Sequence, residues 1–323
     1  MPSAAAYSYL GPAGTFTEAA LEQVEAARGA EWRPVNNIGE ALDHVVGGES
    51  IAAMLAIENT VEGGVAAVLD ALASTPDLRI MGEYLVPVRF ALVGRAGTTL
   101  ADVRSVAAHP VAYAQCRRWL YANLPSHTQL PAASNVQAAQ FLAEHEGDLA
   151  QAAIATPKAG ERYGLATLAE DIGDNPNAVT RFVLVARSGS MPRPASTGAD
   201  KTSIVADLPS DRPGALLELL EQFATRGVNL SLLHSRPIGD ELGRYRFVID
   251  LDGHVDDERV AEALLGVRRF SPRVLFLGSY PRADRRPVAA EARHDDEVYA
   301  EARSWLADLR TEGEALNSPS GLA

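Results

Sequence analysis

The chain has 323 residues, 47% of them hydrophobic, and a formal net charge of −13 at pH 7. This length predicts two or three packing units, and the acidic charge without a dense run of Lys and Arg argues against nucleic acid or an anionic membrane as a partner. The single cysteine, Cys116, excludes an intrachain disulfide, and there is neither a membrane-length apolar stretch nor a signal peptide, so we expect a cytoplasmic protein.

Alternating strands and helices fill the first part of the chain, residues 1–187. Such alternation predicts an α/β unit with largely parallel sheets. The predicted elements are, in chain order, a strand and turn at 8–14, a helix at 15–27, a strand at 51–59, a helix at 65–74, strands at 84–94 and 103–110, helices at 111–124 and 136–147, and strands at 151–156 and 182–186.

The next segment, SGSMPRPASTGADK at 188–201, is rich in Pro, Gly and Ser and has no apolar period, which predicts a linker. After it the pattern changes to strand, helix, two strands, helix and strand within 202–281. This βαββαβ order is typical of a small ferredoxin-like sandwich. The remaining residues, 282–323, are polar and contain a probable helix at 297–310.

Four turns of the first unit share one design, in which a strand gives way to small or polar residues that open a helix. Thr15 followed by Glu18 matches a capping box, and Pro110 suits a first helical position. Backbone N–H groups and the positive end of a helix dipole at such turns favour an anionic ligand, here a carboxylated small molecule. The turn residues are Gly11, Gly14, Thr15, Glu58, Asn59, Thr60, Gly63, Gly64, His109, Ser134 and Asn135.

The stretch NPNAVTRFVLVA, residues 175–186, places Thr180 and Arg181 at the mouth of a short, β-branched and therefore buried strand. A Thr in this position commonly caps a turn, and an Arg there commonly lies at the surface. By position alone the structural role is favoured over a reactive one.

Five motifs in order then carry a resemblance: YLGPAGTFTEAA, AIENTVEGGV, HPVAYAQC, AAIATPKAGERYGL and VTRFVLVA look like the motifs of prephenate dehydratases. The second unit resembles the ACT regulatory domain of that family, with DRPGALLELL and SLLHSRP at the corresponding motifs. The resemblance spans residues 7 to about 281. It implies a two-lobed catalytic domain like a type II periplasmic binding protein, with the second lobe at about 81–174 and the site in the cleft, followed by a ferredoxin-like ACT domain. No chorismate mutase segment precedes Tyr7, so the resemblance implies a monofunctional enzyme. No Cys/His spacing suits zinc, and neither a metal nor a cofactor is expected.

The resemblance implies that the chain loses carbon dioxide and water from prephenate to give phenylpyruvate, in L-phenylalanine biosynthesis. Thr180 matches the residue that the family requires, and we expect its hydroxyl to assist departure of the ring hydroxyl. Arg181 binds a substrate carboxylate or joins the lobes through a buried ion pair, and Glu58 orients Asn59 or acts on a proton. The implied substrate-binding residues are Thr15, Asn59, Thr60, Gly63, Gly64, His109, Gln115, Ser134 and Phe182, the last beneath the ring.

This sequence departs from the family at several positions. Thr60 stands where many members have Ser, and Asn135 stands where Thr is common. Ala178 stands two residues before Thr180, where many members of the family have Asn. A proton route through that amide is therefore missing here, and Asn175 or Asn177 would have to take its place.

The ACT resemblance implies feedback inhibition by L-phenylalanine and a homo-oligomer, dimer or tetramer, formed through ACT domains. The implied phenylalanine-binding residues are Gly214, Ala215, Leu216, His234, Ser235, Arg236 and Pro237. His234 stands where the family has Glu, which predicts altered or pH-dependent feedback. Two alternatives share this architecture: an arogenate dehydratase, whose substrate carries an amine in place of the keto group, and a non-catalytic amino-acid-sensing protein, which would not need Thr180.

Overall fold

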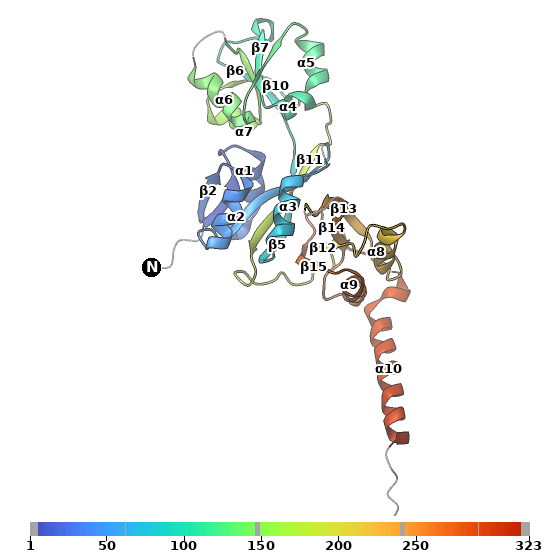
Figure 1. The fold of residues 1–323 in the computed structure, drawn as a ribbon. Helices are drawn as coiled ribbons and strands as arrows, with labels where there is room; N and C mark the ends of the chain where they lie inside the picture. The colour runs from blue at the N-terminus through green and yellow to red at the C-terminus, as the bar shows by residue number, and fades with distance from the viewer. Residues whose placement is uncertain (1–5, 62, 146–148, 240–242, 290, 318–323) are drawn as a thin grey trace, which may run out of the picture. The chain divides into compact units, whose positions relative to one another are not determined.

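The computed structural model describes residues 6–61, 63–145, 149–239, 243–289 and 291–317. Contacts divide the chain into two units, Met1–Pro192 and Arg193–Ala323. Figure 1 shows the elements of both.

A six-stranded sheet forms the first lobe of unit 1, with the order β2-β1-β3-β11-β5 and β4 paired to β3. β1 is parallel to β2 and β3, whereas β11 runs antiparallel to both β3 and β5, so the sheet is mixed and not largely parallel. The chain enters the second lobe after β5 and returns along β11, which explains the reversed direction. The elements are β1 (Ala6–Leu10), α1 (Phe16–Leu21), η1 (Glu25–Ala27), β2 (Glu31–Val35), α2 (Ile38–Gly47), β3 (Ala52–Asn59), β4 (Gly63–Gly64), α3 (Ala66–Ser74), β5 (Leu78–Pro87) and β11 (Val179–Arg187).

Helices cover both faces of this first sheet. On one face Leu21 of α1 packs with Tyr9, Met54 and Phe182 in a buried core. On the other face Ser8 contacts the His44 Nδ1 of α2 at 3.1 Å. Because neighbouring residues of a strand point to opposite faces, the two contacts of β1 place α1 and α2 on opposite sides of the sheet.

The second lobe is a five-stranded sheet with the order β10-β6-β9-β7-β8, also mixed in direction. Its first strand starts at Ala91, because residues up to Pro87 belong to β5 of the first sheet. Leu92 and Ile154 pack against α4 and α5, and the alternating residues Val93 and Ala153 pack against α6 and α7 (Figure 1). The elements are β6 (Ala91–Gly94), η2 (Leu100–Asp102), β7 (Ser105–Ala108), α4 (Pro110–Gln115), α5 (Arg117–Asn123), β8 (Thr128–Pro131), α6 (Asn135–Glu144), β9 (Ala152–Ala155), α7 (Pro157–Arg162) and β10 (Ala166–Ala169).

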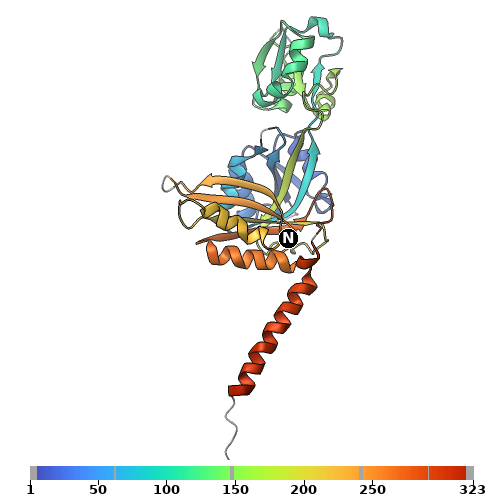
Figure 2. The same ribbon diagram turned by 90° about the vertical axis from the view of Figure 1, so that its right-hand side faces the viewer.

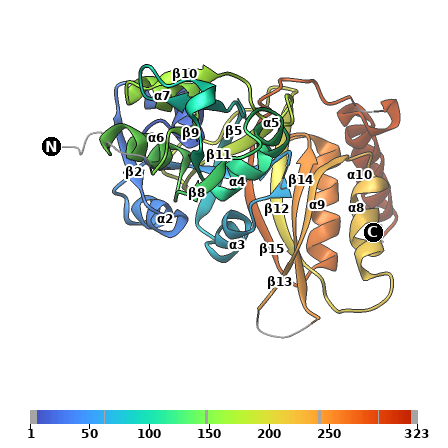
Figure 3. The same ribbon diagram turned by 90° about the horizontal axis from the view of Figure 1, so that it is seen from above.

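Unit 2 contains the predicted βαββαβ order, folded as a four-stranded antiparallel sheet with the order β13-β14-β12-β15. Helices α8 and α9 cover one face of that sheet (Figures 2 and 3), where Phe223, Ile249 and Val260 form the core. The elements are β12 (Asp200–Asp207), α8 (Ala215–Ala224), β13 (Leu230–Pro237), β14 (Tyr245–Asp252), α9 (Glu258–Phe270), β15 (Val274–Pro281), η3 (Ala292–His294) and α10 (Asp296–Asn317). None of the helices in the described ranges is long and apolar enough to cross a membrane.

Candidate functional site

Thr180 lies in β11 between two strand neighbours, opposite Asn59 of β3 and Val86 of β5. The Asn59 Nδ2 donates to Thr180 Oγ1 at 2.7 Å, and Val61 N donates to Asn59 Oδ1 at 2.8 Å, which fixes the direction of the Asn59 amide. Because the Thr180 oxygen already accepts this bond, its O–H proton is directed elsewhere. Thr180 is therefore a buried hydroxyl, 7% exposed, whose donor function is oriented by one amide.

The turn after β3 supports this pair. Thr60 N donates to Val179 O, and Val179 N donates to Thr60 Oγ1, both at 3.0 Å. Gly64 and Gly63 then pair with Glu58 and Asn59 as β4. The Thr60 hydroxyl thus ties the end of β3 to the start of β11 and holds Asn59 opposite Thr180.

Arg181 lies on the face of the sheet opposite to that of Thr180, since successive residues of a strand alternate. Its Nε donates to Glu83 Oε2 at 2.5 Å, and its Nη1 lies 3.5 Å from Glu58 Oε2. Of the two expectations for Arg181 the ion pair is observed. All three residues belong to the first sheet, however, so this ion pair does not join the two lobes.

A cavity of about 410 Å³, here called the strand-end pocket, lies where the first sheet leads into the second lobe, and its lining includes Ala178 but not Thr180. Three of its lining residues are Val61, Val88 and Ala178, which lie just outside β3, β5 and β11 and two residues along the chain from Asn59, Val86 and Thr180. Val88 and Ala178 pack in the core of the second lobe, so this wall lies where the strands of the first sheet lead into that lobe. Gln115 from α4 completes the pocket on the side of the second lobe.

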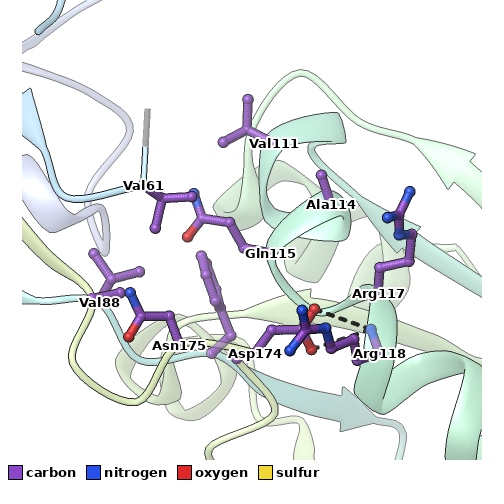
Figure 4. A pocket seen from close by; sticks show the side chains of 12 residues that line it. Val61, Val88, Val111, Ala114, Gln115, Arg117, Arg118, Asp174 and Asn175 are labelled. Carbon is purple, nitrogen blue, oxygen red and sulfur yellow. Dashed lines mark hydrogen bonds between the residues drawn. The ribbon is translucent and has the colours of Figure 1, made fainter. Parts of the chain in front are cut away.

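Figure 4 shows two chemically different ends of the strand-end pocket. The amides of Gln115 and Asn175 lie on the side of Val61 and Val88, and Arg117 and Arg118 lie on the other side.

The acidic residue of this pocket is Asp174, which lies next to Arg118. Its carboxylate accepts from Arg118 N at 3.0 and 3.1 Å and from Trp119 N at 3.3 Å, so it caps the first turn of α5. Burial, with a further contribution from this carboxylate, raises the pKa of the Cys116 thiol to about 12. Cys116 is completely buried, and a neutral packed thiol follows.

A second cavity of about 290 Å³, here called the interlobe pocket, has walls from both lobes. The first lobe contributes Thr15 and Phe16, and the second contributes His109, Ser134 and Thr156. The edge of Phe16 meets Phe90, which lines the strand-end pocket, with ring centres 5.8 Å apart. This aromatic pair therefore belongs to the walls of both pockets.

Helix capping occupies most of the polar groups in the interlobe pocket. Thr15 Oγ1 accepts from Glu18 N and donates to Leu10 O, whereas the Glu18 carboxylate accepts from Gly14 N and not from Thr15 N, so the expected capping box is shifted by one residue. Ser134 Oγ accepts from Gln137 N at 3.0 Å and His109 Nδ1 from Val111 N at 3.3 Å. Among the described residues, the Ser134 O–H and the His109 Nε2 have no hydrogen-bond partner, so these two groups are left for a ligand.

Phe182 differs from its expected place beneath a substrate ring. It is 2% exposed, packs in the core under α1 and lines neither of the two pockets. Strand alternation points Phe182 to the same face as Thr180, but two residues farther from the strand end, where that face is covered by α1.

The residues expected to bind phenylalanine lie on two elements of unit 2. Gly214, with φ of +86°, is the N-cap of α8, and Ala215 and Leu216 are its first residues. His234 to Pro237 end β13, which is an edge strand of the four-stranded sheet.

Several residues of the strand-end pocket were missed from the sequence, namely Arg117, Arg118, Asp174, Phe90 and Val88. The pair of adjacent arginines directly after Gln115 and Cys116 is a signal that could have found the basic end. No comparable signal marks Asp174, which meets α5 from 56 residues away.

Comparison with known proteins gives a consistent family. Residues 7–190 match the family model for prephenate dehydratase, and residues 202–269 match that for the ACT domain. A prephenate dehydratase of Mycolicibacterium vanbaalenii is 44% identical over 316 residues, covering 94% of this chain and 97% of the relative.

Solved structures agree with that match. The structure of prephenate dehydratase from Arthrobacter aurescens in complex with L-Phe has a TM-score of 0.89 and 50% identity, over 95% of this chain and 99% of that one. GqqA, described as a novel type of quorum-quenching acylase, has a TM-score of 0.75 and 30% identity, over 87% of this chain and 100% of that one.

Proposed function

This chain belongs to the prephenate dehydratase family, and we propose that it converts prephenate to phenylpyruvate by decarboxylating dehydration. As a lyase it would break one C–C and one C–O bond without a change of net oxidation state. The observation that carries the proposal, beside the family match, is the buried Thr180 hydroxyl held by Asn59 at 2.7 Å, two residues along the chain from Ala178, which lines a pocket of about 410 Å³. A cavity of this size suits a small carboxylated ring.

The chemistry needs one donor at the leaving oxygen. As the bond between the ring and its carboxylate breaks, its electron pair moves into the ring, the ring hydroxyl departs from the far carbon, and the ring becomes aromatic. A Thr hydroxyl is too weak an acid to release its proton at neutral pH. Thr180 therefore acts by a hydrogen bond to the departing oxygen, a preorganised donor that stabilises the charge developing there.

Asn175 is the amide best placed to serve where Ala178 replaces the family's Asn. It lines the strand-end pocket together with Ala178, and its Oδ1 accepts from Asn177 N at 3.0 Å, which holds its side chain in place. Asn177 takes part in this turn through its backbone, so we assign to Asn175 the role of a second hydrogen-bonding amide for the ligand.

Arg181 and Glu58 have a structural role in this proposal. The Arg181 side chain is 7% exposed and paired with Glu83 and Glu58, on the face of the sheet away from Thr180. A guanidinium that is engaged in this way keeps the three adjacent strands β3, β11 and β5 in register and does not need a substrate carboxylate for its charge.

The second unit gives the enzyme its regulation. We propose that L-phenylalanine binds the ACT domain as feedback inhibitor, supported by the L-Phe complex of the Arthrobacter aurescens relative. Strand β13 leaves one edge of the sheet for a second subunit, which supports a homo-oligomer formed through ACT domains. His234 lies on this edge strand, so we expect the inhibition curve to change with pH.

The test is an assay of the purified chain on prephenate and on arogenate, with and without phenylalanine. We expect phenylpyruvate from prephenate and inhibition by phenylalanine. A preference for arogenate would make the chain an arogenate dehydratase, and no turnover of either substrate would favour a non-catalytic sensing protein.

A further inference from the structure

The basic end of the strand-end pocket has no role in the mechanism above. Arg117 and Arg118 are the first residues of α5, and both are exposed at the pocket (Figure 4). Within the described parts of the chain, neither guanidinium has an ion pair or a hydrogen bond to another residue. Two free guanidiniums beside one cavity form a strong site for a carboxylate, because their N–H groups match its geometry.

The acidic neighbour does not cancel this charge. The Asp174 carboxylate is held by three hydrogen bonds from Arg118 N and Trp119 N, at 3.0 to 3.3 Å. The backbone N–H groups at the start of α5 are thus already occupied, and the two side chains are what remains for a ligand. The lining of this end carries two positive charges and one negative charge, and the excess is positive.

The lining residue nearest to Thr180 along the chain is Ala178. It precedes Thr180 by two residues, which is roughly 7 Å of extended chain. A ligand whose hydroxyl meets Thr180 and whose ring enters the pocket past Ala178 points its far end toward α5. Prephenate has this form, since its ring hydroxyl and its two carboxylates lie at opposite ends of the ring.

We propose that Arg117 and Arg118 bind the side-chain carboxylate of prephenate, the one that phenylpyruvate keeps, and so select the keto acid over arogenate; this rests on the proposed function. The carboxylate that leaves as carbon dioxide is better placed among apolar groups, because a cation on it would stabilise the substrate more than the transition state. Val61, Val88 and Phe90 supply such a wall.

Discrimination against arogenate follows from charge. Arogenate has an ammonium group on the carbon next to the side-chain carboxylate, where prephenate has a neutral keto oxygen. Two guanidiniums repel that ammonium. Because both arginines are exposed, solvent weakens the repulsion. We expect this repulsion to make kcat/KM about tenfold higher for prephenate than for arogenate.

The experiment compares wild type with the double variant Arg117→Gln/Arg118→Gln, the two single variants and Arg117→Lys/Arg118→Lys, with Arg28→Gln as a matched control. Arg28 is an exposed arginine of the same unit that lines neither pocket. We expect the double Gln variant to raise the KM of prephenate and the inhibition constant of phenylpyruvate about tenfold, at nearly constant kcat. The ratio of kcat/KM for prephenate to kcat/KM for arogenate should fall about tenfold. The double Lys variant keeps both positive charges, so its KM for prephenate and its preference for prephenate should stay close to those of wild type.

The outcomes separate the two proposals. Unchanged KM, product inhibition and substrate preference in a folded, active Gln variant would overturn the role of the arginines and leave the dehydratase function standing. A wild-type chain that does not dehydrate prephenate would overturn both. If thermal unfolding shows that the double variant does not fold, the single Gln variants, each expected to give part of the effect, decide the question.

Discussion

Replacing Glu83 by Gln tests whether Arg181 is a structural residue. Arg181 Nε lies 2.5 Å from Glu83 Oε2, with side chains 7% and 3% exposed, whereas the second partner, Glu58, is 36% exposed and 3.5 Å away. Glu83→Gln leaves a buried guanidinium without its close partner, which costs about 3 kcal/mol of folding free energy. Glu58→Gln removes a partner that solvent partly replaces, so its cost is below about 1 kcal/mol.

The assay is thermal unfolding followed by circular dichroism, with both variants measured beside wild type. A unit of this size shifts its Tm by roughly 2–4 °C for each kcal/mol, so Glu83→Gln should lower the Tm by roughly 6–12 °C and Glu58→Gln by a few degrees at most. At temperatures where both variants are folded, we expect the KM of prephenate to change little. Equal Tm shifts for the two variants, or a large rise in KM without loss of stability, would refute the structural role of Arg181.

Three further predictions concern other contacts. Asn59→Ala frees the Thr180 hydroxyl to rotate and should lower kcat about tenfold, the equivalent of one hydrogen bond, with a small effect on KM, as steady-state kinetics would show; an unchanged kcat would contradict the orientation by Asn59. Burial raises the pKa of Cys116 from 9.0 to about 12, so iodoacetamide should modify the thiol only after unfolding, and rapid labelling of the native chain would be inconsistent with this. Between pH 9 and pH 12 only the unfolded thiol ionises, so the free energy of unfolding should fall as the pH rises through this range. Gly227→Ala places a Cβ 2.4 Å from the His294 ring at a φ of +64° and should lower the Tm of unit 2, measured by calorimetry, by several degrees; an unchanged Tm would show that η3 is free to move.

Local pattern was sufficient for much of the fold. The βαββαβ order of unit 2 was predicted correctly, because each of its strands and helices is bounded by Gly, Pro or charged residues and has a period of its own. The helix near the C-terminus was also predicted, at 297–310, and it is observed as α10 at Asp296–Asn317.

Strand boundaries and directions were harder. The apolar run 84–94 was read as one strand, but it ends as β5 at Pro87 and starts again as β6 at Ala91, in a different sheet. Sheet membership depends on pairing with β11 almost a hundred residues later, which no local window contains. The antiparallel return of β11 was missed for the same reason.

The candidate site shows the same division. Asn59 and Thr180 were each expected at the site from the motifs, but the hydrogen bond between them, across 121 residues of sequence, was not predicted. The ion pair of Arg181 with Glu83, across 98 residues, and the cap of α5 by Asp174 come from tertiary packing alone, and nothing around Glu83 or Asp174 in the sequence indicates them.

The central claim is that the Thr180 hydroxyl assists departure of the ring hydroxyl, and the most direct test is the kcat of Thr180→Ala on prephenate beside that of Thr180→Ser. Loss of a donor that acts in the transition state should lower kcat by about 10²–10⁴ with little change in KM, while Ser, which keeps the hydroxyl, retains most of the activity. A folded Thr180→Ala variant that keeps the kcat of wild type would contradict the claim.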